Sequence, residues 1–489
     1  MGWSVSLARR GSHSVSAAAS ARAGAELEMA GRFAQVSQWG SLGLTFAIRA
    51  FRVERNLLPR SLRKLVGSFW VTFAGQGVVL AGVFLVTRLS ATRFGPVGFG
   101  EYQVARRTLA VVVFPLLCGI GVSMPRYMAR DLGSKTGVAH WLMASAGLGV
   151  TLQAIFLGLG TLCAASLGKL TFGIDRRALV FSLLIAVAGQ FCHNLAYAAM
   201  RGMSHFRSAA FLQVTDGVFA PLAGVLVAHG SVERALGVSG GIWVAVGTCA
   251  FVRICRQWAR PLPSAADVLR AVRVLLSFGA PRIPGEVALF GLFALPAYAA
   301  VHRNDIVGAG FLSVGLSLVQ AIAAVFAATG FVLLPYWSRA ARSEDTLVVA
   351  RRRICLLVVA SGLVTALALI VLQVSLRSFA GLLLGPLAEA GLNDIRHVTL
   401  AAVPYVVYLV LRDYFDAISV FPMNTVALTG AIMVEAALLS GGWLSVPVAT
   451  AGGFLALGLF MIALWAASRR QSGAASGNPD SQASREIAC

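Results

Sequence analysis

Residues 139–164 read AHWLMASAGLGVTLQAIFLGLGTLCA and contain no Lys, Arg, Asp or Glu. A helix rises about 1.5 Å per residue, so about 20 apolar residues cross a hydrocarbon core that is about 30 Å thick. Apolar runs of similar length recur from about residue 66 to residue 467. We therefore predict an all-α, polytopic membrane protein of about twelve transmembrane helices.

The composition supports the same class of protein. Hydrophobic residues make up 57% of the chain and charged residues only 12%, whereas soluble proteins carry roughly 25% charged residues. A transmembrane β-barrel would show segments of about 10 residues with alternating polarity, which the sequence lacks. The net charge of +21 comes mainly from short segments between the apolar runs, which is typical of cytoplasmic loops rather than of a surface that binds nucleic acid.

The apolar runs and their charged or Pro/Gly boundaries form two sets of six predicted spans. The first set lies at 66–88, 104–124, 139–164, 178–200, 209–229 and 236–255, and the second at 276–301, 306–334, 353–374, 395–412, 418–438 and 443–467. We accordingly predict a basic, largely disordered tail at 1–64, a first lobe at 65–260, a second lobe at 261–467 and a disordered tail at 468–489. Translation from Met29 instead of Met1 is left open.

Loop charge predicts the orientation of the chain. An even number of spans places both termini on one side, and the loops on that side contain the arginine clusters around Arg126, Arg207, Arg256 and Arg342. Positively charged loops face the cytoplasm. We therefore expect a multi-pass membrane protein with both termini in the cytoplasm.

The chain also repeats itself. A shift of 210 residues lays VGFG at 97–100 on VGAG at 307–310, and it superposes Pro125, interpreted as the end of a helix, on Pro335. Because each lobe has six spans, the two lobes share an orientation and are related by an axis along the membrane normal. This predicts a central cavity lined by the first, second, seventh and eighth spans, as in transporters that work by alternating access.

Two segments resemble a known family. Residues 88–130, RLSATRFGPVGFGEYQVARRTLAVVVFPLLCGIGVSMPRYMAR, resemble the first helical hairpin of Wzx-type polysaccharide flippases, with an FGxxxFGxY turn outside the membrane and a PRYxAR run at the cytoplasmic end. Residues 277–293, SFGAPRIPGEVALFGLF, resemble the family's seventh helix. The likeness covers about residues 66–467, while the tail before residue 60 departs from the family's short N-terminus.

The resemblance implies membership of the multidrug, oligosaccharidyl-lipid and polysaccharide exporter superfamily. It implies a flippase, not an enzyme, of the bacterial cell (inner) membrane, which moves an undecaprenyl diphosphate-linked oligosaccharide from the inner to the outer leaflet for polysaccharide biosynthesis. Its partners would be this lipid-linked oligosaccharide, membrane lipid, a polysaccharide polymerase and glycosyltransferases. The saccharide itself and the coupling ion are left open.

A diphosphate that crosses the membrane interior requires cations in the transport cavity. Arg282 lies about two turns inside the predicted seventh span, and Glu286 follows one turn later on the same face, so each charge could neutralise the other. Pro281 and Pro284 remove backbone hydrogen bonds here, and broken helices commonly line transporter sites. We predict that Arg282 binds substrate; the alternative is an arginine that extends to the cytoplasmic interface.

Arg106 and Arg107 are further candidate substrate cations, because they open the second span from the outer side. Both lie only a few ångströms deep by helical rise, so extension to the outer interface is the alternative. Asp216 and Glu286 are candidates for ion coupling, since desolvation suits a carboxyl to carry a proton. The alternative for each is an acid that is paired within a helix interface.

Two other polar residues within spans are interpreted as structural. Glu435 lies near an outer end of its span, which favours an acid partnered between helices. His193 lies inside the fourth span, where a lone histidine is usually a hydrogen-bonded core residue, and a proton relay is the alternative.

The sequence contains no motif for metal, cofactor or nucleotide chemistry. Its seven cysteines lack CxxC pairs, and there is no P-loop, GxSxG or HExxH motif. Alternatives to the flippase remain open: a membrane-integral polysaccharide polymerase or ligase, a drug/cation antiporter with a lopsided acidic site, a lipid II flippase with several arginines converging in the first lobe, and a scaffold for a biosynthetic complex. No nucleic-acid partner is expected.

Overall fold

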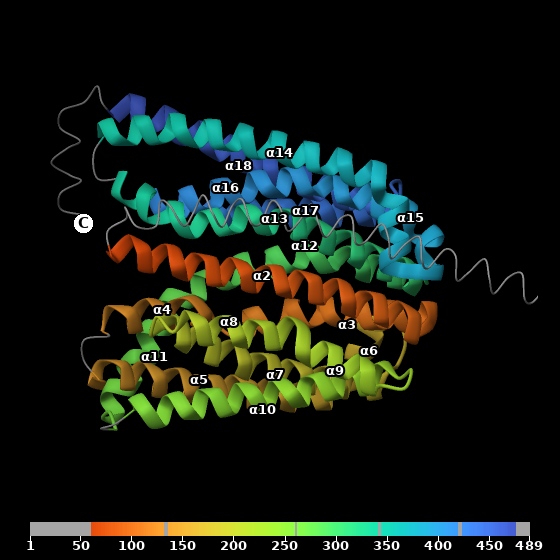
Figure 1. Cartoon of the computed structure of the whole chain (residues 1–489), viewed down its shortest axis with the longest axis horizontal. Helices are drawn as coiled ribbons and strands as arrows, with labels where there is room; N and C mark the ends of the chain where they lie inside the picture. Colours follow the sequence, from red (N-terminus) through yellow and green to blue (C-terminus); the bar gives the residue numbers. More distant parts are fainter. Residues whose placement is uncertain (1–59, 132–134, 260–261, 341–343, 419–422, 476–489) are drawn as a thin grey trace, which may run out of the picture. The chain divides into compact units, whose positions relative to one another are not determined.

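Every regular element in the described residues of the computed structural model is helical, which confirms the all-α prediction (Figure 1). The structure describes residues 60–131, 135–259, 262–340, 344–418 and 423–475, and the side chains of 74–131, 138–259, 262–326, 352–416 and 423–468. The predicted tails lie outside these ranges except for 60–64 and 468–475, which belong to helices.

Within the described ranges, ten helices have 18 or more residues. They are α2 (Arg60–Arg93), α3 (Gly95–Leu116), α5 (Lys135–Leu162), α7 (Arg177–Gly202), α10 (Val232–Trp258), α12 (Ile283–His302), α13 (Ile306–Ala340), α14 (Glu344–Leu384), α17 (Met423–Ser440) and α18 (Val446–Ala475). The shorter elements are α4 (Ile120–Arg130), α6 (Ala164–Phe172), α8 (Phe206–Val214), η1 (Thr215–Phe219), α9 (Ala220–Val227), α11 (Ala265–Gly279), η2 (Ala280–Arg282), η3 (Gly385–Leu387), α15 (Ala388–Val398), η4 (Thr399–Ala401) and α16 (Ala402–Ile418).

Ten helical stretches of the described residues are long and apolar enough to cross a membrane, and a bent pair of helices makes an eleventh. The sequence analysis expects about twelve spans. The difference arises at 352–416, which counts as one stretch of 65 residues but contains both spans expected at 353–374 and 395–412. There, α14 and α16 are separated by the short helix α15.

The second predicted span is broken. Cys118 (φ 47°) and Gly119 (φ 71°) adopt left-handed backbone conformations, so α3 and α4 meet at an angle of 46°. The expectation that Pro125 ends this helix is wrong, because Pro125 lies inside α4. A left-handed residue cannot continue a right-handed helix, so the interruption falls at Cys118 and Gly119 instead.

The helices pack in two groups (Figure 1). In the first, α7 packs along α10 and also contacts α4, α5 and α6. In the second, α12 packs against α17, and α13 packs against α15 and α16. The groups meet where α3 contacts α12 and α13, and where α11 contacts α4 and α5. The helix α11, which the sequence assigns to the second lobe, therefore packs against helices of the first.

Residues that the 210-residue shift relates make equivalent hydrogen bonds or contact one another. Arg93 donates to the Leu226 carbonyl at the end of α9 (2.8 Å), and Arg303 donates to the Leu439 carbonyl at the end of α17 (2.7 Å). Where α3 crosses α13, a Cβ on Gly310 would lie 3.1 Å from the Cα of Gly100, so the two helices meet at repeat-related glycines. These contacts support the repeat.

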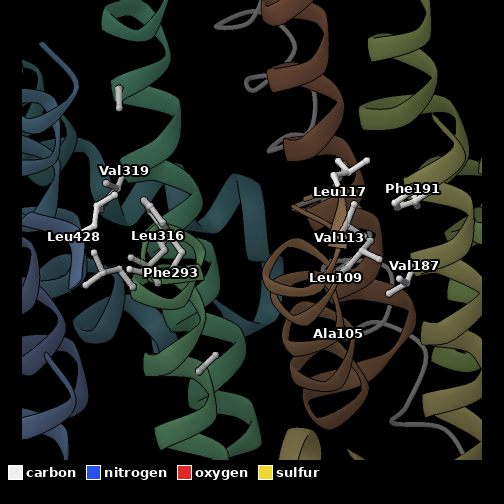
Figure 2. Close-up of a cluster of buried hydrophobic side chains, with 14 of the residues drawn as sticks. Ala105, Leu109, Val113, Leu117, Val187, Phe191, Phe293, Leu316, Val319 and Leu428 are labelled. Atoms are coloured by element: carbon white, nitrogen blue, oxygen red, sulfur yellow. The ribbon is translucent and has the colours of Figure 1, made fainter. Parts of the chain in front are cut away.

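The buried side chains of the two groups lie on either side of this crossing. Figure 2 shows Leu109 and Val113 of α3 facing Val187 and Phe191 of α7, with Leu316 of α13 on the other side near Phe293 and Leu428. The apolar face of α3 is thus used within the first group. Its remaining face carries the polar residues of the candidate site.

Candidate functional site

Arg107 lies at the contact between the two helix groups. Its side chain is only 9% exposed. The guanidinium donates to the Ser313 carbonyl, to Ser317 Oγ at 2.8 Å and to Gln320 Oε1 at 3.2 Å, all on α13. No acid forms an ion pair with Arg107 in the part of the chain that the structure describes. This arginine does not extend to the outer interface, because its guanidinium donates three hydrogen bonds to α13 inside the protein.

A second polar contact joins the same groups one residue further along α3. Tyr298 of α12 donates its hydroxyl to Thr108 Oγ1 at 2.8 Å. The Arg107 guanidinium also lies 5.9 Å from the centre of the Phe293 ring of α12. The junction of α3, α12 and α13 therefore combines one buried cation with neutral hydrogen-bonding groups.

Arg106 points toward the first helix group. Its guanidinium lies 6.0 Å from the centre of the Tyr102 ring, and its charge acts on the Asp216 carboxylate. The two neighbouring arginines thus face different parts of the protein, and of the two only Arg107 contacts α13. This division follows from helix geometry, because consecutive residues on a helix point in directions about 100° apart.

Asp216 lies in η1, a single turn of π-helix between α8 and α9. Such turns are rare and often occur at functional sites. Gln190 Nε2 of α7 donates to both carboxylate oxygens, at 3.0 and 3.2 Å. His193 of α7 brings its Nδ1 to 4.0 Å from Asp216 Oδ1. The sequence treats Asp216 and His193 separately, and the structure places them side by side.

The other nitrogen of His193 bonds to a backbone carbonyl. Nε2 lies 2.9 Å from the Leu212 carbonyl oxygen, and a carbonyl can only accept a hydrogen bond. Nε2 therefore carries a hydrogen, and Nδ1 is the nitrogen that faces Asp216. With His193 2% exposed and the Asp216 side chain 24% exposed, the structure presents a largely enclosed acid–imidazole pair.

Arg282 lies in the single 3-10 turn η2 between α11 and α12, so the expected break in the seventh span is no more than this turn within one helical stretch, Ala265–His302. Its exposed side chain turns back toward α11: Nη1 donates to the Phe278 carbonyl at 3.0 Å, and the guanidinium lies 3.9 Å from the centre of the Phe278 ring. The expected ion pair between Arg282 and Glu286 is not formed, because the guanidinium is held by Phe278.

Glu286 is instead half-buried and faces a charged cluster that sequence reasoning missed. Its Oε2 is buried without a hydrogen-bond partner among the described residues, and the charges of both Arg282 and Arg412 act on it. At the end of α16, Arg412 Nε lies 3.8 Å from Asp416 and 4.0 Å from Asp413. The sequence LRDYFDA at 411–417 carries the three charged residues of this cluster. It begins at the end of the span predicted at 395–412, where charged residues indicate only a span boundary.

Glu435 is 0% exposed. A Cβ on Gly453 of α18 would lie 2.6 Å from the Cβ of Glu435, so the two helices approach closely at this acid. Its position in a helix interface is as expected, but neither of its carboxylate oxygens has a hydrogen-bond partner among the described residues, so the expected partner is not found. Among the described residues, no cluster of His, Cys, Asp and Glu is suited to hold a metal ion.

Comparison with known proteins identifies the fold. No family model and no curated protein matches the sequence. The chain is similar in structure to an inward-facing multidrug resistance MATE family transporter of the MOP superfamily, with a TM-score of 0.64 and 12% identity over 83% of this chain and 99% of that one. It is similar to the lipid II flippase MurJ in an inward closed conformation, with a TM-score of 0.64 and 12% identity over 80% of this chain and 86% of that one.

A MATE protein in a straight conformation is also similar, with a TM-score of 0.55 and 15% identity over 85% of this chain and 97% of that one. These structural neighbours are transporters and a flippase rather than enzymes. The protein therefore has the fold of membrane transporters of the MOP superfamily. At such low identity the likeness defines the fold and leaves the substrate to be argued from the site.

Proposed function

We propose that the protein is a flippase that moves an undecaprenyl diphosphate-linked oligosaccharide from the inner to the outer leaflet by alternating access. The observation that carries this proposal is Arg107, a buried cation at the junction of the two helix groups with no acid partner in the described residues. A buried charge that is not neutralised costs several kcal/mol. An anionic substrate that reaches the junction would offset that cost, whereas a cationic drug would add to it.

The positions of the other candidates fit an anionic substrate. Arg106 and Arg107 lie on α3, and Arg282 lies where the seventh span is broken. These elements belong to the second and seventh spans, which the repeat places around a common axis. We propose that the three arginines line the transport path and neutralise the diphosphate in turn.

Asp216 and His193 are proposed as the coupling pair. They are half-buried to buried, they lie on neighbouring helices, and Nδ1 of His193 faces the Asp216 carboxylate at 4.0 Å. Arg106 acts on the same carboxylate, so the arrival of a diphosphate at Arg106 would change the electrostatic field at Asp216. Glu286 is proposed as a second coupling acid, beside Arg412 in the other helix group.

The test is transport of a fluorescent undecaprenyl diphosphate-linked oligosaccharide by the purified full-length protein in liposomes, compared with a cationic dye. Arg107→Gln should lower transport of the lipid by about tenfold or more at matched protein abundance, because charge-assisted hydrogen bonds are lost. Arg107→Lys should retain part of it, since the charge remains and the planar donor is lost. Transport of the dye alone would instead assign the protein to drug/cation exchange.

Lipid II is a second candidate substrate. The specific observation that favours it is that Arg106, Arg107 and Arg126 all lie on α3 and α4, although their guanidinium groups face different surroundings and do not converge as a lipid II flippase was expected to require. Lipid II carries the same polyprenyl diphosphate, so the arginines do not separate the two substrates. Deletion of the gene separates them: accumulation of a polysaccharide precursor on the inner leaflet supports the first proposal, and accumulation of lipid II supports the second.

A further inference from the structure

The ring of Phe278, the penultimate residue of α11, is contacted by two arginines from different parts of the chain. The guanidinium carbon of Arg282 lies 3.9 Å from the ring centre, and that of Arg126, on α4, lies 4.8 Å from it. Arg126 is otherwise explained by loop charge alone. The structure thus brings a residue of the PRYxAR run and a residue of the seventh-span break onto one aromatic platform.

Both guanidinium groups are exposed, and neither forms an ion pair with an acid in the described residues. The charge of Arg282 acts on Glu286 without an ion pair between them, and Asp131, the residue after α4, accepts a hydrogen bond from Trp141 Nε1 at 2.8 Å. Two cations held against one ring repel each other, and the ring offsets only part of that repulsion. Their unused donors are free to form the bidentate contacts that phosphate groups accept.

The platform itself is held in place by other aromatic rings. Tyr127 meets the Phe278 ring edge-on, with ring centres 5.9 Å apart, and stacks on Trp141 at 4.8 Å. Arg282 is fixed further by its bond to the Phe278 carbonyl. The two guanidinium groups are therefore positioned before any ligand arrives, which lowers the entropic cost of binding.

We propose that Arg126 and Arg282 form a phosphate-binding clamp on Phe278 that takes the diphosphate group of a polyprenyl lipid. This deepens the proposed function, because it rests on Arg282 as a substrate cation and adds Arg126 as its partner. The clamp joins α4, which follows the break at Cys118 and Gly119, to η2, which is the break in the seventh span. A diphosphate held there ties the two broken spans together.

Binding of farnesyl diphosphate, a short and soluble polyprenyl diphosphate, to the purified full-length protein in zwitterionic nanodiscs tests the clamp. Arg126→Ala and Arg282→Ala should each weaken binding by about tenfold or more, and the double variant should lose less than the product of the two effects, because one ligand uses both groups. Farnesol, which lacks phosphate, should not compete. Phe278→Leu should weaken binding while leaving both charges in place.

Arg130→Ala is the matched control, since Arg130 is exposed on the same helix four residues after Arg126 and should bind like wild type. Phosphatidylglycerol in the nanodiscs identifies the source of the phosphate: competition that depends on Arg126 would keep the clamp but assign it to membrane lipid. Wild-type affinity for farnesyl diphosphate in both Arg126→Ala and Arg126→Glu would overturn the clamp. Arginine-dependent binding without transport of any polyprenyl diphosphate lipid would leave the clamp standing and reject the flippase instead.

Discussion

The contact between Gly119 and Gly279 joins the two helix breaks, and replacing Gly279 by Ala tests its importance. A Cβ on Gly279 would lie 2.0 Å from the Cys118 carbonyl oxygen and 3.2 Å from the Cα of Gly119. All of these atoms belong to the backbone, so no flexible side chain can move aside. Carbon atoms prefer separations of about 3.5 Å or more. The end of α11 and the break between α3 and α4 must therefore separate by more than about 1 Å.

Overpacking of this kind costs roughly 1–3 kcal/mol. We expect Gly279→Ala to lower the temperature at which the purified protein in detergent loses its monodisperse peak by several degrees, and to lower transport at matched abundance. Gly147→Ala is the matched control: Gly147 lies in α5 and a Cβ there meets nothing within 4 Å. Removal of a glycine from a helix interior should leave that variant as stable as wild type or more so, by about 0.5–1 kcal/mol. Equal stability and equal transport in the two variants would refute the close contact.

Three other changes test the candidate site and the topology. Asp216→Asn should abolish the response of transport to an imposed pH gradient while leaving substrate binding intact, because the carboxylate that faces His193 Nδ1 can no longer exchange a proton; an unchanged response would remove the coupling role. Glu286→Gln should change the transport rate, because Glu286 is proposed as a coupling acid. It should leave the thermal stability of the protein unchanged, since no ion pair joins Glu286 to Arg282 in the described residues. A large loss of stability would show that the pair forms. In a background without the seven native cysteines, Arg207→Cys should be protected from an impermeant thiol reagent in intact cells and Arg234→Cys should react, as cytoplasmic and outer loops require.

The fold class followed directly from the sequence, because long apolar runs permit only a few structures in a membrane. The break in the second span did not. It depends on Cys118, a non-glycine residue with φ 47°, and neither cysteine nor a single following glycine marks a helix break reliably. Pro125, the stronger local signal, stays inside α4. Proline is accommodated in a membrane helix when neighbouring groups satisfy the freed carbonyl.

The site was predicted unevenly for a related reason. Arg106, Arg107, Arg282, Asp216 and Glu286 were identified because a charged residue within an apolar run is conspicuous. Their partners were not, since a partner on another helix leaves no trace in local sequence. Hydrogen bonding between Gln190 and Asp216 joins α7 to η1, and the cation–π contact of Arg126 joins α4 to α11.

One long-range contact was nevertheless accessible from the sequence through the repeat. If two copies of a unit are related by a two-fold axis, residues near the axis lie next to their own equivalents, as in an isologous interface. The glycine contact at the crossing of α3 and α13 follows this rule for Gly100 and Gly310. Arg107 follows it as well, because its bond to Ser317 joins residues 210 positions apart. If the two helix groups rock about this axis, as the proposed function requires, Arg107 lies beside the axis and an anion bound to it would contact both groups at once. Such an anion would stay bound while the helices on either side move, which is why the proposed function rests on Arg107 rather than on the more exposed arginines.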